Sequence, residues 1–301
     1  MPEKASEGRE SSSDQIESHQ RSAVLDDPRP EAVHVRTQYL LDNKRKEAAD
    51  RFAALAALFD PTSTRHLERC GVGPGWCCLE VGAGGGSIAT WLADRVGASG
   101  AVLATDIEPR FLTALMRPNL EVRRHDIGAE ALPKGAFDLV HARLVLMHVP
   151  DRYQALERMI GALKPGGWIV AEEFDSVSMP AAPDMCPSEV RLETQGALLR
   201  LLEDHGVDRL YGRQLYGALR SHGLVNVDAE GRVLMLRHGS PGESMLRANY
   251  MQLRSQMVDE GYIGDEQVEA DLKRLQDPNF AMPSAVMWSA VGRRPFGIGG
   301  Q

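Results

Sequence analysis

The sequence lacks the features that mark exported, membrane-spanning and nucleic-acid-binding proteins. No apolar run reaches roughly eighteen residues, and the N-terminus has no apolar signal core. The 34 Lys and Arg residues are outnumbered by 42 Asp and Glu, and basic clusters such as Lys44-Arg45-Lys46 are short. Because a phosphate backbone is bound by clustered Lys and Arg, we expect no nucleic-acid partner, no membrane contact and a cytoplasmic location.

Cysteine is also scarce, with four residues: Cys70, Cys77, Cys78 and Cys186. No pair has the C-x-x-C spacing, and Cys77 and Cys78 fall in a segment predicted to be a buried strand. We therefore expect neither a disulfide framework nor a metal site, which fits a reducing compartment. Cys186 is expected to be a passive small residue, with a reactive thiol as the alternative.

The most informative segment that is present runs from Cys77 to Ser87, with the sequence CCLEVGAGGGS. Its first part predicts a buried strand that enters Glu80 and then a glycine-rich turn. Glycine has no Cβ and tolerates positive φ, so the backbone of this turn can lie directly against a nucleotide-like ligand. Residues 84–89 also fit the G-x-G-x-x-A dinucleotide fingerprint. On the glycines alone, a nicotinamide or flavin site and a turn without any ligand both stay open.

Two carboxylates follow later predicted strands at positions that suit a nucleoside. Asp106 ends the apolar segment 101–106, about twenty residues beyond the glycines, where an acidic side chain accepts hydrogen bonds from ribose hydroxyls. A helix N-cap is its alternative role. Asp126 ends the segment that starts at Leu120 and, with Ile127, offers adenine an acceptor for its amine beside an apolar face. A turn-forming Asp is the alternative there.

The chain beyond the glycine turn alternates between predicted strands and helices, as in α/β proteins. Helices are predicted over 88–96, ended by the glycine signal at 97–100, and over 153–163. Strands are predicted over 137–143 and 168–174. A chain of 301 residues, 43% of them hydrophobic, can bury a large core in one such domain plus an accessory segment.

Five motifs in order resemble those of class I S-adenosylmethionine-dependent methyltransferases. They are Glu80 to Gly86, Asp106, His125-Asp126, Phe137 to Val140, and Leu163 to Gly167. The resemblance covers about residues 70–175. It implies an α/β, Rossmann-like fold with a seven-stranded, mostly parallel sheet, helices on both faces and a reversed last strand. The candidate for that last strand is 285–292, and the sixth strand is expected within 225–236.

The regions outside this core are predicted to be a tail and helical additions. Residues 1–30 are too polar to hold a core and are expected to be a disordered tail. Helical periodicity that starts near residue 33 and is broken at Asp60-Pro61 predicts an N-terminal helical cap over 31–66. The cofactor-binding core is then expected over 67–175, a helical lid or substrate insertion over 176–222, and the last strands with further helices over 223–295. The helices expected in these later regions are 189–205, 245–253 and 266–275.

By the same resemblance, the cofactor is S-adenosylmethionine, with its methionine end on the glycine turn. In related small-molecule methyltransferases an N-terminal helical segment lies over the cofactor and carries a tyrosine that meets the methionine carboxylate. Tyr39 is the residue that fits this role here, and packing within an amphipathic helix is its alternative. Arg143 is expected to touch the cofactor carboxylate or the acceptor. The predicted cofactor-binding residues are Tyr39, Glu80, Gly82, Ala83, Gly84, Asp106, Ile107, Asp126, Ile127 and Arg143.

Three titratable residues are candidates for a general base, which is needed only if the acceptor carries a proton that must leave. His141 lies at the end of the fourth predicted strand, His148 one turn into the next helix, and Glu173 at the end of the fifth strand. All three are expected at the carboxyl edge of the sheet, where α/β sites form. A structural role is the alternative for each histidine.

The sequence departs from the patterns of three methyltransferase subtypes. Ala142-Arg143 stands where metal-dependent catechol-type enzymes place an acidic ligand. Met147 precedes His148, where cyclopropane-forming relatives carry a Glu. The asparagine-proline-proline-tyrosine motif of amino and base methyltransferases is missing at 141–144.

The predicted function is therefore methyl transfer to oxygen, carbon or nitrogen of a small organic acceptor, such as a natural product or a quinone-type ring, by a monomer or homodimer. Two alternatives stay open. A nicotinamide-dependent oxidoreductase would share the first strand, the turn and Asp106, and a scaffold protein would bind S-adenosylmethionine without transferring its methyl group.

Overall fold

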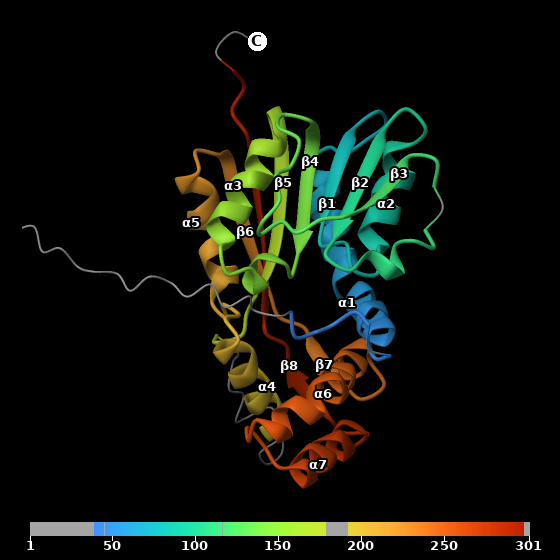
Figure 1. The fold of residues 1–301 in the computed structure, drawn as a ribbon, viewed down its shortest axis with the longest axis vertical. Coiled ribbons are helices and arrows are strands. Elements are labelled where there is room, and N and C mark those ends of the chain that lie inside the picture. The colour runs from blue at the N-terminus through green and yellow to red at the C-terminus, as the bar shows by residue number, and fades with distance from the viewer. Residues whose placement is uncertain (1–38, 45, 116, 179–191, 298–301) are drawn as a thin grey trace, which may run out of the picture. The chain divides into compact units, whose positions relative to one another are not determined.

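The fold is built on a seven-stranded sheet with the strand order β3-β2-β1-β4-β5-β9-β6 (Figure 1). The computed structural model describes residues 39–44, 46–115, 117–178 and 192–297. The strands of the sheet are β1 (Cys77–Val81), β2 (Ala101–Asp106), β3 (Leu120–Arg124), β4 (Phe137–Arg143), β5 (Leu163–Asp175), β6 (Val225–Arg232) and β9 (Val286–Arg293). Neighbours from β3 to β5 pair in parallel, whereas β9 pairs antiparallel with both β5 and β6. The predicted α/β fold with a mostly parallel sheet and a reversed last strand is confirmed.

Helices cover both faces of this sheet. Helices α1 and α2 pack on one face, and α3 and α5 pack on the other. Their bounds are α1 (Ala48–Arg69), α2 (Ser87–Val96), α3 (Arg152–Ala162) and α5 (Tyr211–Ser221). The predicted tail over 1–30 and the predicted helix starts near residues 33 and 189 lie outside the described residues.

Helix α1 runs without a break through Pro61, so the predicted end of the helix at Asp60-Pro61 is wrong. A proline inside a helix removes one backbone hydrogen bond and crowds the preceding turn. Here the residues on either side compensate, because Phe59 and Leu67 are both buried. Packing against the sheet therefore outweighs the local preference.

Two predicted helices shorten to single 3-10 turns. The helix that Asp106 would cap becomes η1 (Pro109–Phe111), and the one after β4 becomes η2 (Leu146–His148). Leu144 adopts a φ of 56°, in the left-handed region, and this interrupts any helix that would follow β4 directly. The resulting tight turn brings η2 back over the end of the sheet.

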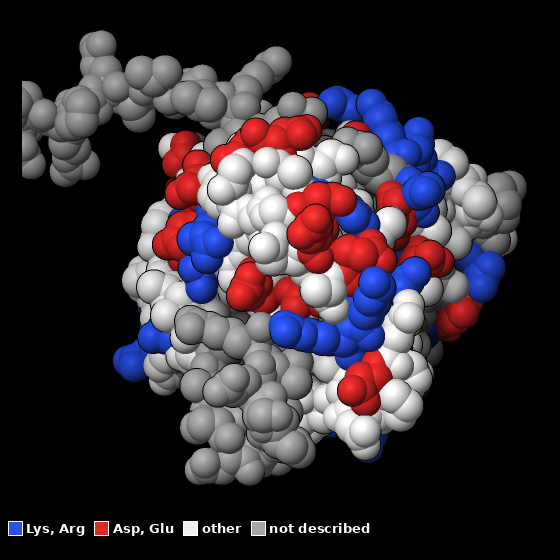
Figure 2. Space-filling view, turned by 90° about the horizontal axis from the view of Figure 1, so that it is seen from below, with Lys and Arg blue, Asp and Glu red and all other residues white. Residues whose placement is uncertain are grey.

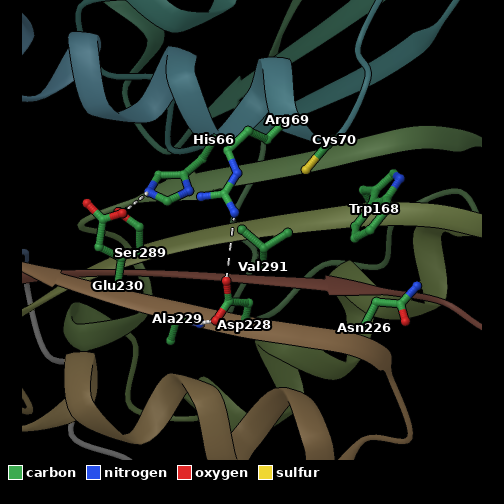
Figure 3. Close-up of a pocket in the computed structure, with 10 residues that line it drawn as sticks. All are labelled: His66, Arg69, Cys70, Trp168, Asn226, Asp228, Ala229, Glu230, Ser289 and Val291. Carbon is green, nitrogen blue, oxygen red and sulfur yellow. Dashed lines mark hydrogen bonds and ion pairs between the residues drawn. The ribbon is translucent and has the colours of Figure 1, made fainter.

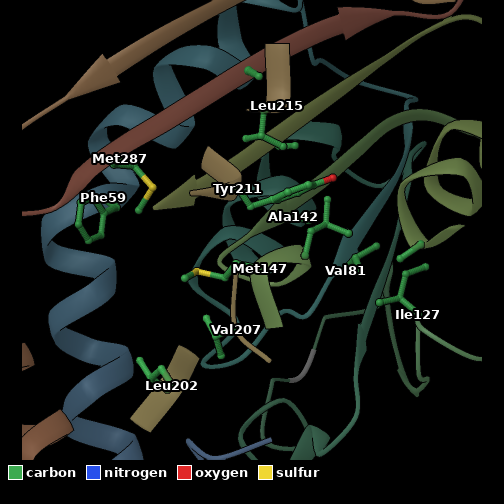
Figure 4. Packing of buried hydrophobic residues seen from close by; sticks show 14 of the residues in the cluster. Phe59, Val81, Ile127, Ala142, Met147, Leu202, Val207, Tyr211, Leu215 and Met287 are labelled. Atoms are coloured by element: carbon green, nitrogen blue, oxygen red, sulfur yellow. The ribbon is translucent and has the colours of Figure 1, made fainter. Parts of the chain in front are cut away.

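Alternation along the strands separates two buried clusters. Leu79 and Ala142 belong to the cluster that also contains residues of α3 and α5, whereas Cys78 and Leu139 belong to the cluster with α1 and α2. Figure 4 shows Tyr211 in the first cluster, near Ala142. Alternate residues of these strands therefore pack into different clusters.

A helical cover lies beyond the carboxyl edge of the sheet (Figure 1). It consists of α4 (Glu193–Asp204), α6 (Pro241–Asp259) and α7 (Asp265–Leu275), with the short strands β7 (Met235–Arg237) and β8 (Ala281–Pro283) paired beside them. Helix α6 packs along α1, and Gln252 donates a hydrogen bond to the carbonyl of Asp42 at 2.9 Å. Seen from this end, acidic and basic side chains are interspersed (Figure 2). None of the described helices is both long and apolar enough to cross a bilayer.

Candidate functional site

The glycine turn after β1 has the backbone conformation that its sequence predicts. Gly82, Gly84 and Gly86 have φ values of 65°, 52° and 79°, which side chains with a Cβ rarely adopt. The Ala83 N–H donates to the carbonyl of Thr105 at 2.9 Å. The turn is thereby fixed against β2, and Gly86 leads directly into α2.

Phe52 of α1 lies on this turn. A Cβ on Gly84 would stand 2.6 Å from Cε1 of Phe52, and a Cβ on Gly85 would stand 2.8 Å from its Cβ. A Cβ on Gly82 would collide with Val145. Glycine is therefore needed here for the packing of the chain's own side chains, in addition to any approach of a ligand.

Asp106 joins the glycine turn to the end of β2. Its Oδ2 accepts a hydrogen bond from the Gly84 N–H at 2.9 Å, and its Oδ1 accepts from the Glu108 N–H at 2.9 Å. The Asn43 side chain lies 3.5 Å from the same Oδ1. Burial, at 6% exposure, raises the pKa of Asp106, and the two backbone donors oppose that rise. Each carboxylate oxygen still has capacity for a further donor.

Arg51 is a site residue that the sequence analysis missed. It is 3% exposed and donates to the Tyr39 hydroxyl at 3.3 Å, the Leu41 carbonyl at 3.0 Å and Asn43 Oδ1 at 3.1 Å. Its Nε is buried without a partner among the described residues. The guanidinium carbon lies 4.7 Å from the centre of the Phe52 ring, and Phe52 in turn covers the glycine turn. A buried cation with a spare donor at this place suits an anionic group.

The helical spacing of α1 contains a signal for Arg51. Its buried face includes Ala48, Arg51, Ala54 and Phe59, which are three to five residues apart. A permanently charged side chain on an otherwise apolar helix face is unusual, since Arg is seldom fully buried without partners. The same face continues with Ser63, whose hydroxyl binds the carboxylate of Glu172.

Tyr39 and His148, predicted for different roles, lie together at this edge. Their ring centroids are 5.2 Å apart and their planes are perpendicular. Burial, followed by the charges of Arg51 and Arg152, lowers the pKa of His148 to about 4. The imidazole is therefore neutral near pH 7, and it is half-buried.

His141 and Glu80 lie inside the molecule, in a buried cluster under α1. His141 Nδ1 is 2.6 Å from Glu80 Oε2, and Nε2 is 3.2 Å from Glu172 Oε2. Burial by itself would lower the pKa of His141, but the two carboxylates raise it to about 9. The ring is doubly protonated near pH 7, so neither nitrogen is free to take a proton from an acceptor.

Glu173 lies on the opposite face of β5 and holds the turn after β4. Its Oε1 accepts hydrogen bonds from the backbone N–H groups of Val145, at 3.0 Å, and Leu146, at 2.7 Å. Its Oε2 is buried with no partner among the described residues. Burial raises the pKa of Glu173 to about 8, against the effect of these backbone donors. The carboxyl group thus shapes the segment that carries His148.

The remaining predicted residues are spread over different surroundings. Arg143 binds α1, with Nη1 donating to Ser63 Oγ at 2.9 Å and Nη2 lying 2.9 Å from Asp60 Oδ1. Asp126 accepts from the Gly128 N–H at 2.8 Å, which is the turn role left open above. The two apolar residues differ, since Ile127 is 4% exposed in the core and Ile107 is 40% exposed.

A separate hollow lies between the end of α1 and strands β5, β9 and β6 (Figure 3). Its volume is about 140 Å³, below the roughly 300–1,000 Å³ of most small-molecule sites. The residues that line it are His66, Arg69, Cys70, Trp168, Asn226, Asp228, Ala229, Glu230, Ser289 and Val291. It is not lined by the glycine turn or Asp106, and we do not assign it to the cofactor.

Comparisons with known proteins identify the family. A family described as "Methyltransferase domain" matches residues 79–171. The chain is also 30% identical to the ubiquinone/menaquinone biosynthesis C-methyltransferase UbiE of Idiomarina loihiensis over 172 residues, which are 50% of this chain and 68% of that enzyme. The chain belongs to the class I S-adenosylmethionine-dependent methyltransferases. The family predicted from the five motifs is confirmed.

Other relatives of this methyltransferase chain cover less of their own length. It is 34% identical to methyltransferase str3 of Strobilurus tenacellus over 145 residues, 48% of this chain and 50% of str3. The match to str2 of the same fungus covers 49% of that protein at 34% identity. The chain therefore spans about half the length of these relatives.

Solved structures share the fold of the methyltransferase chain. A Haemonchus contortus phosphoethanolamine N-methyltransferase 2 in complex with S-adenosylmethionine matches 86% of this chain and 60% of its own, with a TM-score of 0.55 and 14% identity. The YcgJ protein of Bacillus subtilis matches 78% of this chain and 98% of its own, with a TM-score of 0.50 and 13% identity. At such identities the likeness concerns the fold alone.

The carboxyl edge fits the cofactor of this family. It combines a glycine turn of fixed geometry, a carboxylate at the end of β2 with spare acceptor capacity, and the unpartnered Nε of Arg51. Within the described residues, no group of three His, Cys, Asp or Glu side chains is arranged to hold a metal ion.

Proposed function

We propose that this chain transfers the methyl group of S-adenosylmethionine to a small organic acceptor. The observation that carries this proposal is the convergence of the glycine turn, Asp106 and Arg51 at one edge of the sheet. Family membership supports it, and so do relatives named as a quinone C-methyltransferase and as methyltransferases str2 and str3. We accordingly favour a quinone-type ring or another natural-product ring as the acceptor.

The residues at this edge divide the binding of the cofactor among them. Arg51 and Tyr39 would hold the carboxylate of its methionine part, since Arg51 has a spare donor and shares a hydrogen bond with the Tyr39 hydroxyl. Asp106 would accept hydrogen bonds from the ribose hydroxyls. The cofactor, when bound, supplies an electrophilic methyl group on a positively charged sulfur.

The protein then has to orient the acceptor and exclude water. The segment from Tyr39 to Lys44, the turn that carries His148 and the helical cover surround the edge from different sides. Of the two histidines predicted as a base, His148 is the one that is neutral near pH 7 and is not held between two carboxylates, although its lowered pKa makes it a weak base. His148 would accept the proton of an acceptor that has one to lose.

Calorimetric titration with S-adenosylmethionine, followed by an assay for S-adenosylhomocysteine with quinone-type and phenolic acceptors, tests the proposal. Asp106→Ala should weaken cofactor binding by about 1–3 kcal/mol through lost hydrogen bonds. Asp94→Ala, which removes an exposed carboxylate of α2, serves as the control and should leave the affinity unchanged. Thermal unfolding without ligand checks that both variants fold.

Failure of the wild-type protein to bind the cofactor would refute the proposal. Tight binding without product from any acceptor would instead favour the scaffold role, in which the site is used without methyl transfer.

A further inference from the structure

One face of the sheet carries a row of polar and charged side chains directly beneath α1. The strand register pairs Glu80 with His141 and Glu172 with both Arg143 and Ser289, so these residues share a face. All of them except Arg143 are buried. The residues next to them in the same strands, such as Val81 and Ala142, belong to the apolar cluster on the other face.

This row is tied to α1 by several hydrogen bonds. Ser63 of α1 and Ser289 of β9 both donate to the Glu172 carboxylate, Ser289 to Oε1 at 2.6 Å and Ser63 to Oε2 in a short hydrogen bond. Arg143 contacts Ser63 and Asp60, as described above. Asp60 Oδ1 also accepts from the Ser87 hydroxyl at 3.1 Å, at the first residue of α2.

The charges in this network require a cation at the centre. His141 lies between the buried carboxylates of Glu80 and Glu172. If the ring were neutral, Glu80 would have no close cationic partner among the described contacts, and Glu172 would have only Arg143. A buried carboxylate without such a partner is strongly destabilising. The geometry therefore favours an imidazolium that donates from both nitrogens.

The network is connected to the cofactor edge through the length of α1. Arg51 and Phe52 precede Ser63 by about eleven or twelve residues on the same helix, which corresponds to roughly 17 Å along its axis. The helix is unbroken from Ala48 to Arg69, so a tilt that starts at Ser63 would shift Phe52 relative to the glycine turn.

We propose that His141 is a positioning residue. By joining Glu80 to Glu172 it fixes the carboxylate that binds Ser63, and it thereby holds α1 where Phe52 meets the glycine turn and Arg51 lies over the Phe52 ring. Its effect on cofactor affinity rests on the function proposed above. Its effect on α1 does not.

Two serines offer a matched pair for the test, because both hydroxyls bind the same carboxylate and only one belongs to α1. Hydrogen exchange of residues 48–69, measured without ligand and relative to the exchange of the sheet strands in the same variant, should rise about tenfold in Ser63→Ala and less than about twofold in Ser289→Ala. The dissociation constant for S-adenosylmethionine should rise about tenfold in the first variant and stay within about twofold in the second. His141→Gln should behave like Ser63→Ala, with His222→Gln as a histidine control outside the network.

The outcomes separate this inference from the proposed function. Equal effects of the two serine variants, or unchanged exchange of α1 in a folded His141→Gln, would overturn it. A nitrogen NMR spectrum that shows a neutral His141 ring at pH 7 would overturn it as well. If the wild-type protein does not bind the cofactor, the proposed function fails while the exchange data still decide the role of His141. If His141→Gln does not fold, the serine pair decides alone.

Discussion

Glu172 and Glu173 are neighbours in β5, equally buried, and yet they are held in opposite states. Glu172 faces α1, where burial favours its protonated form but the hydrogen bond and charge of His141 lower its pKa to about 2. Glu173 faces α5, where burial raises its pKa to about 8. The partners on each face, and not the depth of burial, decide whether the carboxyl group is charged.

The two faces use their carboxyl groups for different purposes. On the α1 face, Glu172 is bound by His141, Ser63 and Ser289 and connects a helix to three strands. On the α5 face, Glu173 binds only backbone N–H groups among the described contacts and shapes the turn before His148. The charged network around Glu172 binds α1 to the sheet, whereas Glu173 binds the turn that precedes His148.

The largest expected effect comes from replacing the carboxyl group on each face by an amide. Glu172→Gln should cost about 3–5 kcal/mol of unfolding free energy, because it deprives the buried His141 imidazolium of a partner. Glu173→Gln should be neutral or stabilising, since the amide oxygen still accepts from Val145 and Leu146 without a buried charge. Urea denaturation at pH 8 measures both. Equal losses would mean that the faces do not differ in the way described.

Alkaline pH should weaken the α1 face in the wild-type protein. The folded pKa of His141 is raised from 6.5 to about 9, so its contribution is complete below pH 6.5 and is lost as the pH rises through 9. This loss amounts to about 3 kcal/mol. The raised pKa of Glu173 removes stability over an earlier range, from 4.5 to about 8. Urea midpoints measured between pH 5 and 10 should therefore fall in two steps in the wild-type protein. In Glu173→Gln the decrease between pH 5 and 8 should disappear, and the decrease around pH 9 should remain.

A pair of hydroxyl deletions gives a smaller effect. Ser289→Ala should cost about 1–2 kcal/mol, because it leaves a buried carboxylate oxygen of Glu172 without its donor. Tyr211→Phe should be neutral, since the buried Tyr211 hydroxyl has no hydrogen-bond partner among the described residues. Thermal unfolding of the two variants compares them. A substantial loss in Tyr211→Phe would reveal a polar contact on the α5 face and weaken the contrast.

The last expected effect is confined to acidic pH and concerns His148, at the turn that Glu173 holds. Its pKa is lowered from 6.5 to about 4, so the folded protein resists protonation and loses stability as the pH falls from 6.5 towards 4. His148→Gln should reduce this acid sensitivity, whereas His222→Gln should not. Melting temperatures between pH 4.5 and 7 provide the measurement, and an unchanged acid slope in His148→Gln would contradict the assignment.

Local patterns were enough to predict much of the fold and part of the site. The glycine turn and Asp106 at the end of β2 depend on residues close together in sequence, so their signals survive without tertiary context. The reversed strand near the C-terminus was expected from the family resemblance instead. The continuation of α1 through Pro61 was not predictable in this way. The local cost of proline was outweighed by burial against a distant sheet.

The order of strands and helices, the family and an expected place for the cofactor could be predicted from the chain alone, because period, turn residues and motif spacing are local properties. The surroundings of the titratable residues, in contrast, depend on tertiary contacts. His141 meets Glu80 and Glu172 because parallel strands far apart in sequence align in one register. Phe52 reaches the glycine turn, with Arg51 lying over its ring, because α1 packs on one face of the sheet. Such contacts depend on register and helix placement, which no segment of the chain specifies alone.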